Sequence, residues 1–134
     1  MVKYEYSGKK NPNQISDIKV WVRETHIDRT LIAYHLPHIE KRSPDGSQWE
    51  YGGSGPSDFA LSILSHFCKN RSLSQEIADK YYQDFKFAFV AKFDDEFKIS
   101  CREIAEWLVD KDPQLEEILF KGRTKKNNEQ IQNN

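Results

Sequence analysis

The order of residue patterns along the chain limits its fold more than any other feature. Two runs rich in β-branched and aromatic residues, "IKVWV" and "RTLIAYHL", favour antiparallel strands at about residues 18–23 and 29–36. From residue 56 to about residue 120 the apolar residues recur at helical spacing instead. This order predicts an α+β fold, in which a small antiparallel sheet in the N-terminal half packs against three to four C-terminal helices.

Capping signals divide the helical part of the chain. Helices are expected at about residues 56–69, 73–93 and 100–110, followed by a short one in "QLEEILF". Pro56 suits a first helical position, with Ser54 or Gly55 as the cap before it. Ser72 with Gln75 matches the capping box that opens a helix. These helices and the strands should share one core that contains Trp21, Leu31, Ala60, Leu64, Phe85, Phe89 and Trp107.

The remaining segments set the expected domain limits. Residues 1–17 are polar, and Tyr4 and Tyr6 alternate there as in a short edge strand. Residues 18–120 should form a single domain, with "QWEY" as a third short strand and "FKI" as a short extended piece. Residues 121–134 contain almost no apolar side chains and are expected to form a disordered tail.

Composition excludes several classes of protein. Twenty basic and twenty-one acidic residues give a formal charge of -1, unlike the clearly basic domains that coat nucleic acid. No apolar stretch is long enough to span a bilayer, and the N-terminus lacks the apolar segment of a signal peptide. The two cysteines, Cys68 and Cys101, lie in apolar helical patterns and are expected to be free buried thiols. We therefore expect a cytoplasmic protein with no membrane partner.

The glycine-rich stretch "YGGSGPSD", residues 51–58, is the main candidate site. Glycines let backbone N–H groups converge on an anion, and the following helix adds its positive N-terminal end. The loop is therefore predicted to bind a phosphate group of a ligand. The expected ligand-binding residues are Tyr51, Gly52, Gly53, Ser54, Gly55 and Ser57. Arg42, upstream of the Pro-Asp-Gly turn, could reach the same phosphate.

Other interpretations of this loop stay open. It is not a P-loop, because no lysine follows at the required position. A nucleophile elbow at Ser54 would need glycine at position 56, where this chain has Pro56. The loop could also be a tight strand-to-helix turn, with Asp58 capping its own helix or bonding the loop backbone.

Several other residues have side chains suited to metal binding or to stacking. His35 and His38 could suggest a metal pair, but Pro37 breaks any helical register and no cluster of ligands accompanies them. The acidic residues 94–96 are expected to form a solvent-exposed helix cap rather than a Mg²⁺ site. Tyr82 and Phe87 lie off the main apolar stripe of their helix, where they could form a second packing face, a dimer contact or a platform for a base. No metal and no cofactor is predicted.

Four stretches of the chain resemble a small family known only as a domain of unknown function. They are the Ser-Pro-x-Gly turn at 43–46, the Tyr-Gly-Gly-Ser-Gly-Pro-x-Asp-x-Ala loop at 51–60, the Tyr-x-x-Phe-Lys helix at 82–86 and the Trp-Leu pair at 107–108. The resemblance covers about residues 18–110 and implies a bacterial or phage, mobile-element setting. It brings no established activity or catalytic residue. It also implies that Lys86 lies near the glycine loop, where Lys86 is expected to be a further ligand-binding residue.

Three classes of function follow. The first is a non-enzymatic protein that binds a phosphorylated small molecule, such as a nucleotide signal that a phage would sequester from a host defence system. The second is a protein–protein interaction module that inhibits a host enzyme through its aromatic helix, and a homo-oligomer is compatible with either class. An enzyme ranks last, because no paired carboxylates, Cys/His pair or metal cluster has suitable spacing.

Overall fold

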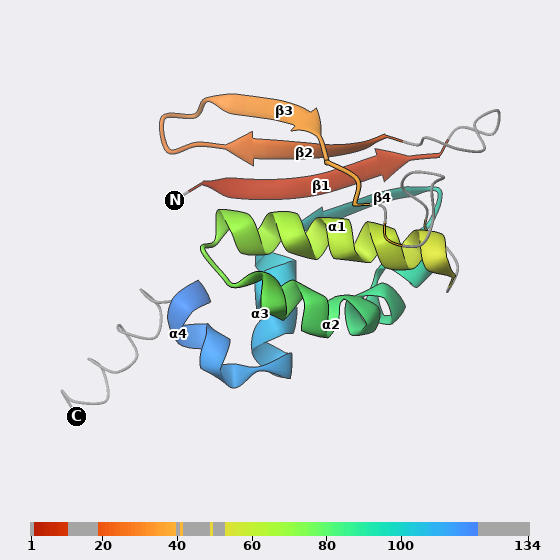
Figure 1. Cartoon of the computed structure of the whole chain (residues 1–134). Helices are drawn as coiled ribbons and strands as arrows, with labels where there is room; N and C mark the ends of the chain where they lie inside the picture. The colour runs from red at the N-terminus through yellow and green to blue at the C-terminus, as the bar shows by residue number, and fades with distance from the viewer. Residues whose placement is uncertain (1, 11–18, 40, 42–48, 50–52, 121–134) are drawn as a thin grey trace. The chain divides into compact units, whose positions relative to one another are not determined.

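The computed structural model describes residues 2–10, 19–39, 41, 49 and 53–120 (Figure 1). The chain forms two compact units, one ending at Ser100 and the other beginning at Cys101. Within these residues, a four-stranded antiparallel sheet and four α-helices confirm the predicted α+β class. The predicted strand at "QWEY" and the predicted tail at 121–134 lie outside the described residues, apart from Trp49.

All four strands belong to the first unit. They are β1 (Lys3–Lys9), β2 (Val20–Thr25), β3 (Leu31–His35) and β4 (Glu96–Ser100). Their order in the sheet is β3-β2-β1-β4, and every pair is antiparallel. The predicted hairpin is confirmed as β2 and β3. The prediction that Tyr4 and Tyr6 lie in an edge strand is wrong, because β4 pairs with the other side of β1.

The helices follow the expected order with shifted ends. The first unit contains α1 (Ser54–Asn70), α2 (Gln75–Ala88) and the 3₁₀ turn η1 (Val90–Lys92). Helix α1 begins two residues before Pro56, with Gly53 as its N-cap. Helix α2 is capped by Ser74, whose side chain accepts a hydrogen bond from the Glu76 N–H (3.2 Å). The predicted capping box at Ser72 is wrong, since Ser72 has a left-handed backbone (φ 57°) and precedes the cap.

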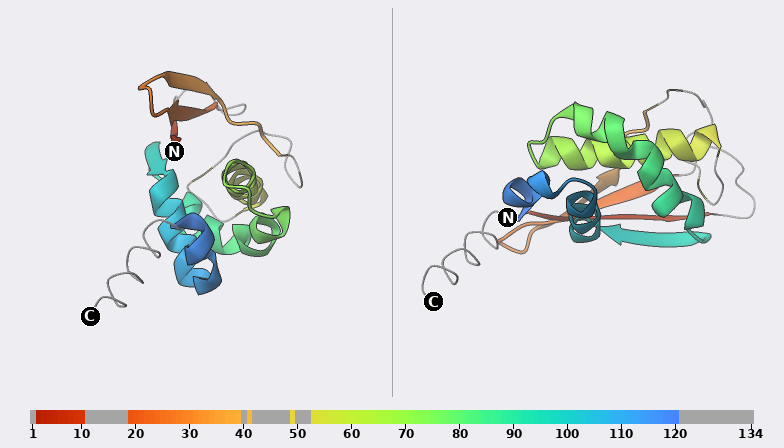
Figure 2. Two further views of the ribbon diagram at one scale, coloured as in Figure 1. Left: turned by 90° about the vertical axis from the view of Figure 1, so that its left-hand side faces the viewer. Right: turned by 90° about the horizontal axis from the view of Figure 1, so that it is seen from below.

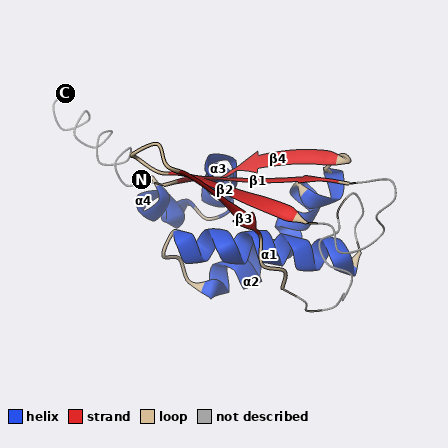
Figure 3. Cartoon of the chain, turned by 90° about the horizontal axis from the view of Figure 1, so that it is seen from above, coloured by secondary structure: helices blue, strands red, loops and turns tan. Residues whose placement is uncertain are grey.

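Helix α1 lies along one face of the sheet, and α2 packs beside it (Figures 2 and 3). From Gly55 to Cys68, every described side chain of α1 is buried except the half-buried His66. Phe59 of α1 packs against Phe97 of β4, with ring centroids 5.6 Å apart. A helix surrounded by apolar contacts needs partners on more than one side, and the sheet and α2 supply them.

The core contains only part of the set expected from the sequence. Ala60, Leu64 and Phe85 are fully buried, whereas Phe89 and Trp107 are half-buried. Trp21 and Leu31 are 42% and 64% exposed, so their predicted core positions are wrong. Successive strand residues point to opposite faces of a sheet. Val20 and Val22 occupy the buried face of β2, which leaves Trp21 on the other face.

The second unit contains α3 (Cys101–Lys111), the 3₁₀ turn η2 (Pro113–Leu115) and α4 (Glu116–Leu119). Asp112 caps η2 by accepting a hydrogen bond from the Gln114 N–H (3.2 Å). Cys68 and Cys101 are free and buried, as the sequence predicted. Within the described residues, no helix combines the length and apolar character needed to cross a membrane.

An aromatic cluster fills the end of the sheet where β1 and β4 pair. Trp49 is fully buried, and its ring centroid lies 5.6 Å from that of Phe59 and 5.0 Å from that of Phe97. Its indole N–H donates to the Asp94 carbonyl (2.7 Å). A Cβ atom at Gly8 would lie 2.7 Å from Phe97 Cε1 and 3.2 Å from Trp49 Cη2. Glycine at position 8 therefore makes room for this cluster.

Phe85→Ala is expected to lower the free energy of unfolding by roughly 3–5 kcal/mol, because Phe85 is fully buried and its removal leaves a cavity. Phe87→Ala is the matched control on the same helix, since its side chain is 58% exposed, and should cost less than about 0.5 kcal/mol. Urea denaturation of both variants measures the difference. Equal losses would contradict the assignment of Phe85 to the core.

Gly8→Ala is expected to cost about 1–3 kcal/mol of unfolding free energy, because the added methyl group must displace closely packed rings. Ser7→Ala, at the next position of β1, is the control because its side chain lies on the opposite face of the sheet. Thermal denaturation followed by near-ultraviolet circular dichroism also reports the environment of Trp49. A Gly8→Ala protein as stable as the parent would show that the cluster has free space.

Candidate functional site

The described residues of the glycine loop form hydrogen bonds with other parts of the fold. Ser57 is buried, and its hydroxyl lies 3.1 Å both from the Gly53 carbonyl and from Gln83 Oε1. Asp58 is also buried and accepts a hydrogen bond from the Lys41 N–H (3.0 Å) through Oδ2. The Ser57–Gly53 bond lies within the loop and suits a structural turn, whereas Asp58 bonds the backbone at Lys41 and not the loop backbone that was expected.

The other predicted loop residues divide into two groups. Gly53 and Gly55 belong to the start of α1, where Gly53 is extended (φ −89°, ψ −165°) and has no side chain to cap the helix. Arg42, Tyr51, Gly52 and the side chain of Ser54 lie outside the described part of the structure. Phosphate binding by this loop therefore stays a prediction.

Lys86 lies at the same end of the helix pair as the glycine loop. Gln75 bonds Ser65 (2.8 Å) and Gln83 bonds Ser57 (3.1 Å), so α2 runs antiparallel to α1. Lys86 lies three residues, or slightly less than one turn, beyond Gln83 in α2, which places it level with the first residues of α1. Its side chain is only 5% exposed.

The two aromatic residues singled out on α2 have different surroundings. Tyr82 is buried, with the Lys41 ammonium 5.2 Å from its ring centroid, so it belongs to a packing face. Phe87 is 58% exposed, and the Lys86 ammonium lies 4.0 Å from its ring centroid. Phe87 is therefore the member of the pair that is available to a partner.

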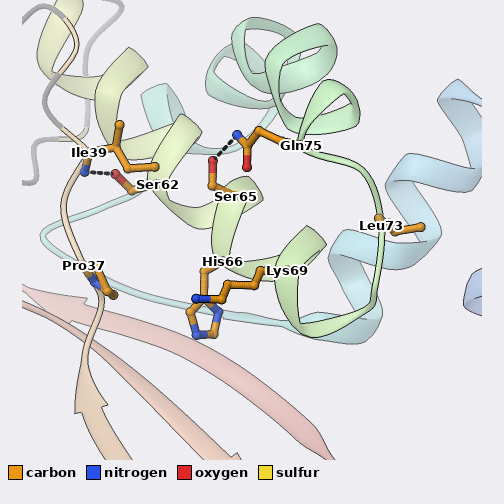
Figure 4. Close-up of a pocket in the computed structure, with 8 residues that line it drawn as sticks. All are labelled: Pro37, Ile39, Ser62, Ser65, His66, Lys69, Leu73 and Gln75. Atoms are coloured by element: carbon orange, nitrogen blue, oxygen red, sulfur yellow. Dashed lines mark hydrogen bonds between the residues drawn. The ribbon is translucent and has the colours of Figure 1, made fainter.

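A groove of about 410 Å³ opens beside the middle of α1 (Figure 4). Its residues come from three parts of the chain: the segment after β3, helix α1, and the turn into α2. They are Pro37, Ile39, Ser62, Ser65, His66, Lys69, Leu73 and Gln75. Cavities of roughly 300–1,000 Å³ are the usual size for small-molecule sites. This groove is consequently a second candidate site, which the sequence did not indicate.

Hydrogen bonds from α1 hold the groove open in a fixed shape. Ser62 accepts a hydrogen bond from the Ile39 N–H (2.8 Å) and donates to the Asp58 carbonyl (2.8 Å). Ser65 accepts one from the side-chain amide of Gln75 (2.8 Å). The first bond fixes the segment after β3 along α1, and the last fixes the start of α2. Both walls are thus attached to the same helix.

His66 forms the end of the groove nearest the sheet. Its Nδ1 lies 2.7 Å from the Tyr6 hydroxyl of β1, and its Nε2 lies 2.6 Å from the Tyr34 hydroxyl of β3. Burial lowers the pKa of His66, Glu24 opposes that shift, and Lys69 adds to it. Burial and Glu24 raise the pKa of Tyr34 to about 12, so this phenol stays protonated at neutral pH. A neutral imidazole can bond both tyrosines, donating from one nitrogen and accepting at the other.

The groove combines a positive charge with apolar surface. Lys69 is the charged residue among those described as lining it, and its ammonium can contact an anion. Pro37 and Ile39 supply apolar surface on one side. The hydroxyls of Ser62 and Ser65 already take part in hydrogen bonds, as do both nitrogens of His66.

The groove could have been noticed in the sequence through the polar residues of an otherwise apolar helix. Asp58, Ser62 and His66 recur every four residues and therefore share one face of α1.

The two histidines considered as a metal pair, His35 and His38, have other surroundings. His35 packs against Trp21 with ring centroids 4.2 Å apart, and both ring nitrogens of His38 are buried with no hydrogen-bond partner among the residues that the structure describes. Among the described residues, no group of three or more His, Cys, Asp or Glu side chains is placed to hold a metal ion.

The pH dependence of stability tests the environment of His66. Because its pKa is lowered in the folded state, the unfolded chain takes up a proton more readily as the pH falls below the ordinary value of 6.5. The free energy of unfolding should therefore decrease between about pH 7 and pH 5, and decrease less in His66→Gln, which cannot titrate. Urea denaturation at each pH measures both slopes. Equal slopes would contradict the buried, uncharged state of His66.

The sequence of the chain matches the model of a protein family whose function is unknown. The matching model is described as a family of unknown function (DUF6166) and covers residues 6–110. The chain therefore belongs to this family, and the expected resemblance to a family of unknown function is confirmed. The match begins in β1 and includes Tyr6 and Tyr34, the two tyrosines whose hydroxyls contact His66. No curated protein and no solved structure matches the chain.

Proposed function

We propose that this member of the DUF6166 family is a non-enzymatic binding protein that holds a phosphorylated small molecule in the groove beside α1. The observation that supports the proposal is the composition of the groove, which combines an apolar wall with the Lys69 ammonium in a cavity of about 410 Å³. The apolar wall can cover a flat ring system. The ammonium can contact a phosphate, which makes a nucleotide a suitable ligand.

The hydrogen bonds around the groove favour binding over catalysis. A general base needs an accessible lone pair within reach of its substrate. Both nitrogens of His66 face tyrosine hydroxyls instead, at 2.7 Å and 2.6 Å. Ser62 accepts from a backbone N–H and donates to a backbone carbonyl, so it is not positioned as an activated nucleophile.

The glycine loop remains an alternative position for the phosphate. It lies at the N-terminus of the same helix, two turns before Ser62, and Lys86 is level with it. Arg42 and Ser54 belong to this alternative, whereas Lys69 belongs to the groove. In the mobile-element setting implied by the sequence motifs, either position would suit the cytoplasmic sequestration of a nucleotide signal made by a host defence system.

Protein interaction is the second candidate function, and the exposure of Phe87 favours it. An aromatic side chain that is 58% exposed on α2 can anchor a partner surface. In this case the chain would inhibit a host enzyme by docking through α2. Phe87→Glu should then release the host enzyme while leaving nucleotide binding unchanged.

A thermal-shift screen of nucleotides and other phosphorylated metabolites tests the main proposal. A ligand present at about 100 times its dissociation constant should stabilise the protein by roughly 2.7 kcal/mol. Lys69→Ala should then weaken binding by about 1 kcal/mol and reduce its salt dependence, because a partly exposed charge contact is lost. Isothermal titration calorimetry on the folded variant measures both effects.

Matched variants locate the site. Lys80→Ala removes an exposed lysine from α2, outside the residues that line the groove, and should bind like the parent. Ser54→Ala and Arg42→Ala probe the glycine loop. If these two weaken binding and Lys69→Ala does not, the phosphate lies at the loop. If no phosphorylated compound in the screen stabilises the protein, the binding proposal is wrong.

A further inference from the structure

Strand β3 forms an edge of the sheet in the described part of the chain. It pairs with β2 on one side and with no described element on the other (Figure 1). Such an edge presents backbone N–H and C=O groups that can pair with another strand. Soluble proteins commonly protect their edge strands with charged side chains, prolines or bulges.

The two edge strands of this sheet, β3 and β4, differ in their charged side chains. The segment from Thr30 to His38, "TLIAYHLPH", contains no Lys, Arg, Asp or Glu. Leu31 and Ile32 in it are 64% and 44% exposed. On the opposite edge, β4 carries exposed Lys98, which lies 3.8 Å from Glu5 of β1. Only the β3 edge is therefore both apolar and uncharged within the described sheet.

Exposed apolar side chains also concentrate around β3. Among the described residues, the exposed large hydrophobic side chains of the first unit are Trp21, Ile27, Leu31, Ile32, Ile39 and Phe87. All of these except Phe87 belong to the β2–β3 hairpin or to the segment that follows it. A concentration of this kind on one element marks an interaction surface.

The hydrogen-bond register shows which backbone groups face the open edge. The Leu36 N–H donates to the Val20 carbonyl (2.7 Å), and the His26 N–H donates to the Thr30 carbonyl (2.9 Å). Hydrogen-bonded positions alternate along an antiparallel pair, so the even-numbered residues of β3 bond to β2. The N–H and C=O groups of Leu31, Ala33 and His35 consequently point to the open edge.

We infer that β3 pairs antiparallel with β3 of a second copy of this chain, about a two-fold axis at Ala33. Ala33 then faces the partner's Ala33, and Leu31 faces the partner's His35. In each of these pairs both outward backbone groups find a partner. Ile32 faces the partner's Tyr34 on the helix-covered side, so the two sheets join into one continuous sheet.

A second copy suits this edge because the side chains of β3 are compatible with those of an antiparallel β3 beside it. The small residue lies on the axis, and large side chains face large side chains on both sides of it. No like charges are brought together, because the segment carries none. Closed two-fold pairing also covers the exposed edge of both copies at once, which leaves no free β3 edge for further growth.

Two substitutions on β3 test the pairing in the full chain. Ala33→Pro removes an N–H that points to the open edge and leaves the bonds to β2 in place, as proline is tolerated in edge strands. Leu31→Lys places a charge in the pairing surface. Each change occurs twice in the dimer and should weaken association by roughly tenfold or more. Phe87→Lys is the control, because it adds the same charge at an exposed position on α2.

Analytical ultracentrifugation over concentrations up to the millimolar range measures the association, and circular dichroism verifies that each variant is folded. The expected result is a wild-type dimer that both β3 variants weaken and Phe87→Lys preserves. If Ala33→Pro does not fold, Leu31→Lys decides the question alone. A wild type that stays monomeric throughout, a dimer that survives Leu31→Lys, or equal weakening by Phe87→Lys would overturn the inference.

Discussion

The burial of α1 is the constraint on which the rest of the first unit depends. This helix carries Ser57, Asp58, Ser62 and Ser65 into positions that are at least nine-tenths buried. Buried polar groups are costly unless they are hydrogen-bonded, so each of these side chains needs a partner from a neighbouring segment. The partners are backbone groups of the segment after β3 and side chains of α2. The polar side chains of α1 therefore fix the positions of its neighbours, and apolar contacts alone would specify them less closely.

The groove is a consequence of the same hydrogen bonds. Ser62 holds the backbone at Ile39, and His66 holds the hydroxyls of Tyr6 and Tyr34. Between these hydrogen bonds, the segment after β3 runs along α1 but does not fill the space beside Ser65 and Lys69. This space is the groove, and both residues line it. A cavity formed between fixed hydrogen bonds keeps its shape before a ligand arrives, which reduces the entropy cost of binding.

The sequence predicted the elements of the fold better than it predicted their surroundings. Runs of β-branched and aromatic residues located the β2–β3 hairpin, and helical periodicity located the helices, because these patterns depend on local geometry. The capping signals were less accurate, since α1 and α2 are capped by Gly53 and Ser74. Which face of β2 would be covered could not be predicted. The large apolar side chain of Trp21 suggested that its face was the buried one. Val22, on the other face, pairs with Tyr6 and Tyr34, and these two tyrosines contact His66 of α1.

The sequence did not predict the groove, because its residues come from three segments that no single motif links. The glycine loop attracted attention as a local motif, although Ser57 within it is occupied by contacts inside the fold.

Tyr34 connects the groove with the open edge of the sheet. It belongs to β3, and its hydroxyl lies 2.6 Å from His66, which lines the groove. An anion bound at Lys69 would offset the effect of that ammonium, which lowers the pKa of His66, and would therefore favour a protonated ring. A protonated imidazole must donate from both nitrogens, so the tyrosine hydroxyl that donates to the neutral ring would then have to accept a hydrogen bond. Tyr34 is one of the two tyrosines whose hydroxyls contact this ring, and it belongs to the strand at the proposed interface. The proposed ligand and the proposed second copy would thus lie beside one hydrogen-bonded group.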